Sequence, residues 1–160
     1  MRNAVRYEVT MPRGVRDDRF ELETQAGAQA ASTLAVDVIY TSEAGTRSAL
    51  KTAWALARGL GARVCLVFVY AVPYALPLNE PAVSLPFLKA NLAKLASGFP
   101  GEASVNIYLC REPFATLCDV LRGSSLVVLG GRVRWWVTQE RRLARRLKKL
   151  GHHVVFVESR

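Results

Sequence analysis

Two short segments carry groups that would bind an anion. Gly130-Gly131 ends the apolar run SLVVLG and is followed by two arginines, and Tyr40-Thr41-Ser42 ends the apolar run LAVDVIY. In α/β proteins, backbone N–H groups, hydroxyls and guanidinium groups hold phosphates where a strand runs into a loop. The candidate nucleotide or anion site is therefore Tyr40, Thr41, Ser42, Gly130, Gly131, Arg132 and Arg134.

Each segment also has a purely structural interpretation. Ser42 is a suitable N-cap for a helix that follows it, and capping is compatible with a ligand role. Gly130-Gly131 is explained equally by a tight strand-to-helix turn that needs glycine at positive φ. Both interpretations stay open at this point.

Positive charge is concentrated near the end of the chain. The net charge of the chain is +9. Residues 132–149 contain eight basic residues and one acidic residue, Glu140, so the net charge of this segment is 8 − 1 = +7. The expected basic surface is Arg141, Arg142, Arg145, Arg146, Lys148 and Lys149. A solvated helix face is one interpretation, and an acidic protein, nucleic acid or an anionic membrane surface is the other. Trp135, if exposed, would add an interface residue.

The sequence offers no catalytic or metal-binding constellation. Glu43, Glu112 and Glu140 are isolated, and His152 and His153 are neighbours in an expected strand, where side chains alternate between faces. Three cysteines without a close pair indicate free thiols in a reducing compartment. The start of the chain lacks a secretory signal, and no apolar run reaches the roughly 20 residues of a membrane span. We therefore expect a cytoplasmic protein that is not an enzyme and binds no metal.

Strands and helices alternate along most of the chain. Apolar, β-rich runs predict strands over 34–40, 62–71, 104–110, 125–130 and 152–158. Apolar residues at helical spacing predict helices after Ser42 to Leu60, over 87–97, from Pro113 to Gly123 and over 135–150. This order requires a parallel sheet with helices on both faces. Residues 1–32 read as a flexible tail and linker, although a docked strand around 7–11 is an alternative, and 33–160 form one domain.

The domain resembles the universal stress protein family. The resemblance rests on VIYTSEAGTRSALKTAWALARGLGARVCLVFVY, on the helix REPFATLCDVL, and on SLVVLGGR leading to a helix and VVFVE. It implies a flavodoxin-like or Rossmann-like three-layer sandwich with a five-stranded parallel sheet in the order 3-2-1-4-5. It also implies a homodimer formed through the last strand, and hence through Val154, Val155, Phe156 and Val157.

The chain departs from the family's ATP-binding pattern. Tyr40 stands where an Asp closes the first strand, and Asp37 lies too early and is expected to point away from the site. The family's loop G-x-x-G-x9-G-[ST] has Val133 and Leu143-Ala144 at its later positions, where side chains would crowd a triphosphate. We expect a regulatory or stress-response module without the usual ATP site, acting through dimerisation and a protein partner. The alternative is a nucleotide-binding protein, for ATP, AMP or a cyclic dinucleotide, with an arginine-rich loop.

Overall fold

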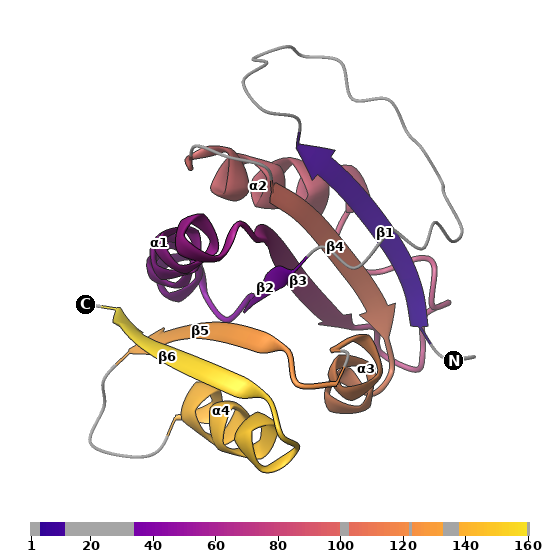
Figure 1. The fold of residues 1–160 in the computed structure, drawn as a ribbon. Helices are drawn as coiled ribbons and strands as arrows, with labels where there is room; N and C mark the ends of the chain where they lie inside the picture. Colours follow the sequence, from indigo (N-terminus) through magenta and orange to yellow (C-terminus); the bar gives the residue numbers. More distant parts are fainter. Residues whose placement is uncertain (1–3, 12–33, 100–102, 122, 133–137, 160) are drawn as a thin grey trace.

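The computed structural model describes residues 4–11, 34–99, 103–121, 123–132 and 138–159. Strands and helices alternate after the first strand, as Figure 1 shows. The elements are β1 (Ala4–Met11), β2 (Ala35–Ile39), α1 (Glu43–Leu60), β3 (Arg63–Ala71), α2 (Leu85–Ser97), β4 (Ala103–Cys110), α3 (Pro113–Val120), β5 (Leu126–Arg132), α4 (Gln139–Lys149) and β6 (His153–Ser159). None of the helices in these residues is long and apolar enough to cross a membrane.

The strands form one sheet in the order β1-β4-β3-β2-β5-β6. Strands β2 to β6 pair in parallel, as the alternation with helices requires, whereas β1 pairs antiparallel with β4. The prediction of an α/β fold is confirmed, but the sheet has six strands in place of five, and its complete order differs from the predicted one. Numbered from β2, the five parallel strands alone lie in the order 3-2-1-4-5.

Strand β1 corrects the interpretation of the N-terminal segment. Residues 4–11 pair with β4 from Ala4 opposite Cys110 to Met11 opposite Ala103, so they belong to the sheet and not to a tail. The alternating residues Val5, Tyr7 and Val9 pack against the core, which explains why a polar-looking segment docks. This segment is a docked strand, as in the alternative interpretation for residues around 7–11, and the strand begins at Ala4. The remainder of the expected tail lies outside the described residues.

Helices cover both faces of the sheet. One core lies between the sheet and helices α1 and α2, and the other between the sheet and helices α3 and α4 (Figure 1). Helix α1 packs mainly on β5, β2 and β6, and α4 packs on β5 and β6. The limits of α1 are set locally, because Ser42 caps its start and Gly61 ends it in the left-handed conformation, φ 60°.

Helix α4 begins later than predicted. Thr138 is its N-cap and accepts a hydrogen bond from the Arg141 backbone, so the helix starts at Gln139 and not near residue 135. Trp135, Trp136, Val133 and Arg134 lie outside the described residues. The expected apolar stripe holds at Leu147, which is fully buried, but fails at Leu150, which is 54% exposed. Leu150 follows the last helical residue, and Gly151 turns the chain away into β6 at φ 92°.

Candidate functional site

The two segments predicted to bind an anion lie next to each other. The hydroxyl of Thr41, after β2, donates a hydrogen bond of 2.6 Å to the carbonyl oxygen of Gly130 in β5. The backbone N–H of Thr41 donates to Oγ1 of Thr46, and the Ser42 hydroxyl accepts from the N–H of Gly45. The structural interpretation of Ser42 as an N-cap is therefore confirmed. The Thr41 hydroxyl, the Thr41 N–H and the Ser42 oxygen are therefore engaged within the protein.

Gly130 is required by packing. A Cβ atom built on Gly130 would lie 1.8 Å from the carbonyl oxygen of Gly45, so the first turn of α1 and strand β5 touch backbone to backbone. The proposed need for positive φ is wrong, because the glycines with positive φ in the described residues are Gly61, Gly123 and Gly151. The first turn of helix α1 therefore contacts the backbone of Gly130 directly.

The other strand-end residues do not converge on one point. The Tyr40 ring is half-buried and meets Phe68 edge to face, with centroids 4.9 Å apart. Gly131 is buried, and a Cβ there would crowd Phe156 at 3.0 Å and Glu140 at 3.2 Å. Arg132 is exposed at the end of β5. In the part of the chain that the structure describes, the candidate site is therefore a packed junction with the exposed Arg132 beside it.

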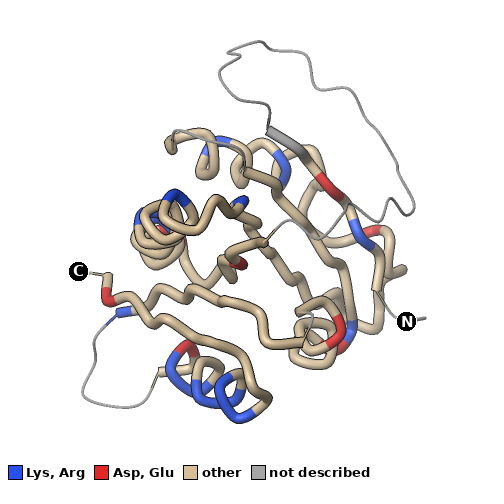
Figure 2. The backbone as a smooth tube through the Cα atoms, in the orientation of Figure 1, with Lys and Arg blue, Asp and Glu red and all other residues tan. Residues whose placement is uncertain are grey.

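Helix α4 presents a continuous basic surface. Its apolar side, with Ala144 and Leu147, is buried against the sheet, and the blue of Lys and Arg predominates along the helix in Figure 2. Five basic residues of α4 are exposed, and we call them the α4 basic face: Arg142, Arg145, Arg146, Lys148 and Lys149. The sixth predicted residue, Arg141, is half-buried, forms a 3.0 Å ion pair with Glu158 and lies over the Phe156 ring.

The charge of the α4 basic face is not neutralised by the described residues. Among the described residues, ion pairs join Arg6 to Glu8, Arg47 to Glu43 and Arg141 to Glu158. None of these pairs involves a residue of the α4 basic face. Arg146 is ordered in another way, because its guanidinium lies 3.4 Å from the centroid of the Phe114 ring of α3. The face is thus a fixed positive surface that the fold leaves open to solvent.

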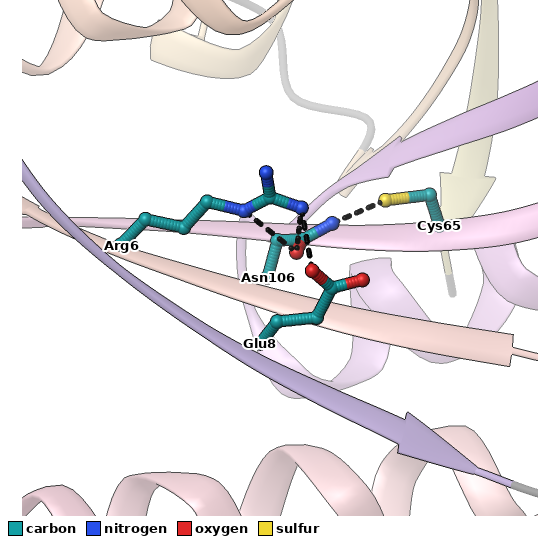
Figure 3. Close-up of polar contacts among 4 residues, drawn as sticks. All are labelled: Arg6, Glu8, Cys65 and Asn106. Carbon is teal, nitrogen blue, oxygen red and sulfur yellow. Dashed lines mark hydrogen bonds and ion pairs between the residues drawn. The ribbon is translucent and has the colours of Figure 1, made fainter. Parts of the chain in front are cut away.

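A polar network crosses the sheet, and the sequence interpretation missed it. Asn106 of β4 accepts hydrogen bonds from Arg6 of β1 at 3.3 and 3.0 Å and donates to the Cys65 sulfur of β3 at 2.9 Å (Figure 3). Arg6 also pairs with Glu8 at 2.8 Å, and Cys65 is hydrogen-bonded to Asp37 of β2. The available signal was a polar residue inside each of the apolar strands LAVDVIY and SVNIYLC.

The network contains no activated nucleophile. Burial, followed by the charge of Asp37, raises the pKa of the Cys65 thiol to about 11, so the sulfur is protonated at neutral pH. Burial also raises the pKa of Asp37 to about 6, although hydrogen bonds with Ser125 and Cys65 oppose this shift. Burial raises the pKa of Tyr108 to about 12. At pH 7 Asp37 is therefore largely ionised, whereas the Cys65 thiol and the Tyr108 hydroxyl keep their protons.

Arg111 is a second residue that the sequence interpretation passed over. Its guanidinium donates to the carbonyl oxygens of Val72 at 2.8 Å, of Leu76 at 2.6 Å and of Pro73. It also lies 5.1 Å from the centroid of the exposed Tyr74 ring. Arg111 therefore clamps the loop after β3, and its donors are directed into that loop.

The predicted dimer strand is at the edge of the sheet. Strand β6 pairs with β5 on one side, and no other described strand covers its outer edge. Val154 is buried, whereas Val155, Phe156 and Val157 are half-buried. Dimerisation stays a prediction. In the described part of the chain, no group of three side chains gathers that would hold a metal ion, and the three cysteines are free.

Comparisons with known proteins do not identify a relative. No protein-family model, curated protein or solved structure matches this chain. The resemblance to universal stress proteins therefore remains an expectation from the sequence.

Proposed function

We propose that the protein is a non-enzymatic binding module that holds a polyanionic partner against the α4 basic face. One observation carries the proposal: five exposed cations lie on one side of an 11-residue helix without an ion-pair partner among the described residues. Like charges held this close repel each other, and an anionic partner relieves that repulsion. The buried side of α4 fixes the helix, so the charges are presented on a rigid support.

The expected role as a partner-binding module is thus assigned to the α4 basic face. The regulatory and stress-response interpretation rests on the family resemblance alone. No observation favours the alternative of a nucleotide at the strand ends, because Thr41 and Ser42 are hydrogen-bonded within the protein and α1 packs against Gly130. The protonated Cys65 thiol likewise gives no support to an enzymatic role.

Elution from immobilised heparin tests the proposal. We expect the triple variant Arg145→Gln, Lys148→Gln, Lys149→Gln to elute at clearly lower salt than the parent protein. The matched control is Arg58→Gln, Lys51→Gln, Lys94→Gln, which removes the same three charges from exposed positions of α1 and α2. If both variants shift equally, net charge alone explains retention and the α4 basic face has no special role.

A further inference from the structure

We infer that the partner of the α4 basic face is a nucleic-acid duplex, bound through its phosphate backbone without reading of the base sequence. This inference rests on the proposed function and specifies its partner. It is drawn from three properties of α4: where its apolar side lies, which side chains its exposed side carries, and how densely they are charged.

The burial of the apolar side argues against a membrane surface. An amphipathic helix that lies on a bilayer inserts its apolar side among the lipids. In this protein Ala144 and Leu147 are buried against the sheet, and Leu143 packs against the same core. Among the described apolar side chains of α4 and its ends, Leu150 is the exposed one. Attraction to lipid would therefore rest on charge without insertion.

The exposed side chains argue against a protein partner. Stable protein interfaces are anchored by buried aromatic and apolar residues together with arginine, and lysine is depleted in them. Beyond Gln139 at its first position, the exposed residues of α4 are all arginine or lysine. Within residues 139–149 this surface offers arginine but no exposed aromatic or apolar anchor, and the exposed Leu150 lies just beyond it. It also offers few side-chain amides, the groups that commonly distinguish adenine in a groove. Its arginines and lysines are the residues that contact phosphates, and the comparison of two unrelated duplex sequences below tests whether any of them also reads guanine.

The density of charge matches that of a duplex. From Arg142 to Lys149 the helix rises by about 10 Å, and it carries five exposed cations over this length. Double-stranded DNA carries one negative charge per about 1.7 Å, or roughly six over the same length. Arg146 stacks on Phe114, which holds its planar guanidinium in place while leaving N–H groups to donate to a phosphate.

Fluorescence anisotropy with labelled duplexes tests this inference. The probes are two short DNA duplexes of unrelated sequence and one RNA duplex, titrated between about 50 and 200 mM KCl. We expect both DNA sequences to bind within about twofold of each other. The logarithm of the association constant should fall with the logarithm of salt concentration with a slope of about −4, as expected for four to five phosphate contacts.

The triple variant used on heparin should bind the DNA duplexes at least about tenfold more weakly than the parent protein. Its salt dependence should be shallower, with a slope about three units closer to zero. The control variant of α1 and α2 should retain most of the parent's affinity for the duplexes and most of its salt slope. RNA binding with the same slope extends the inference to both nucleic acids. Binding to DNA alone restricts it to that duplex.

Two results separate this inference from the proposed function on which it rests. If heparin retention depends on α4 but neither duplex binds at low salt, the nucleic-acid inference is overturned and the polyanion proposal stands. Binding to phosphatidylserine vesicles without duplex binding would assign the face to lipid and overturn the inference in the same way. Strong preference for one DNA sequence would overturn the claim that only the backbone is recognised.

Discussion

At the scale of single residues, Gly130 shows how a candidate ligand residue can have another purpose. Its lack of a side chain lets β5 touch the first turn of α1, and the Thr41 hydroxyl crosses the same junction to the Gly130 carbonyl. The glycine of a phosphate loop and the glycine of a close helix–strand contact are identical in sequence. The two roles are distinguished by what a side chain at that position would contact in the folded protein, and at Gly130 it would contact the backbone of Gly45.

Gly130→Ala should destabilise the fold. The new Cβ would meet the Gly45 backbone, which is not free to move aside, so we expect a loss of about 3 kcal/mol or more in the free energy of unfolding. Urea denaturation followed by circular dichroism measures this. The matched control is Gly59→Ala on α1, where nothing lies within 4 Å and a gain of about 0.5–1 kcal/mol is expected. Equal stability of the two variants would show that the junction is loose.

Asp37 should make the stability of the protein depend on pH. Its folded pKa of about 6 lies above its ordinary 3.8, so the folded state binds the proton more tightly than the unfolded state. The resulting stabilisation is fully present below about pH 4 and is lost as the pH rises through about 6. The difference between the two pKa values corresponds to roughly 3 kcal/mol at most.

Asp37→Asn tests this dependence, because the amide carries no charge at any pH. We expect the variant to be more stable than the parent near pH 7 and to lack the decline between about pH 4 and 6. Urea denaturation at several pH values measures both effects. Asp119→Asn on the exposed side of α3 serves as the control and should follow the parent curve. Parallel curves for the parent and Asp37→Asn would contradict the assignment.

At the scale of elements, side chains from separate strands and loops hold the sheet together. The network through Arg6, Asn106 and Cys65 attaches β1 to strands far from it in sequence. Arg111 has a comparable effect on the loop after β3, since one guanidinium satisfies carbonyl groups that the turn leaves unpaired. Both are polar attachments between segments that are distant in sequence.

Arg111→Lys should loosen the loop after β3. An ammonium keeps the charge but lacks the planar fork that reaches Val72 and Leu76 together. Losing about 1.5 kcal/mol of local stability would speed chymotrypsin cleavage after Tyr74, which is 78% exposed, by about tenfold. Mass spectrometry of the fragments identifies the cleavage. Arg58→Lys on α1 is the control, and equal rates in the two variants would show that Arg111 does not restrain the loop.

At the scale of the whole molecule, a charge of +9 acts on every association. Binding to a polyanion should weaken as salt screens the attraction, whereas pairing of two copies should strengthen as salt screens their repulsion. Opposite salt responses therefore distinguish the two kinds of assembly. They also allow the expected dimer and the proposed partner to be studied in the same preparation.

The predicted dimer through β6 should appear in light scattering as a species of twice the 17.6 kDa chain mass. An edge strand that no other described strand covers, with Val155 and Val157 on it, favours pairing with a second copy. We expect the dimer fraction to rise with protein concentration and with salt. A mass equal to the single chain at every salt and protein concentration would exclude this dimer.

The sequence by itself determined the features that depend on neighbours along the chain. Apolar runs and helical spacing predicted strands β2 to β6 and the four helices, and Ser42 marked the start of α1. The same spacing placed most of the basic residues of α4 on its exposed side. These features follow from covalent geometry and from the fixed periods of helix and strand, which are written into local sequence.

Only the tertiary structure decided the features that join distant residues. Strand β1 pairs with β4, about a hundred positions away, and three of its alternating side chains pack against the core. The sequence around β1 does not indicate which strand it pairs with. The approach of Gly45 to Gly130 and the path from Arg6 through Asn106 to Cys65 arise in the same way. Such contacts depend on the order of strands in the sheet and on how closely layers pack, and those properties exist only once the whole chain has folded.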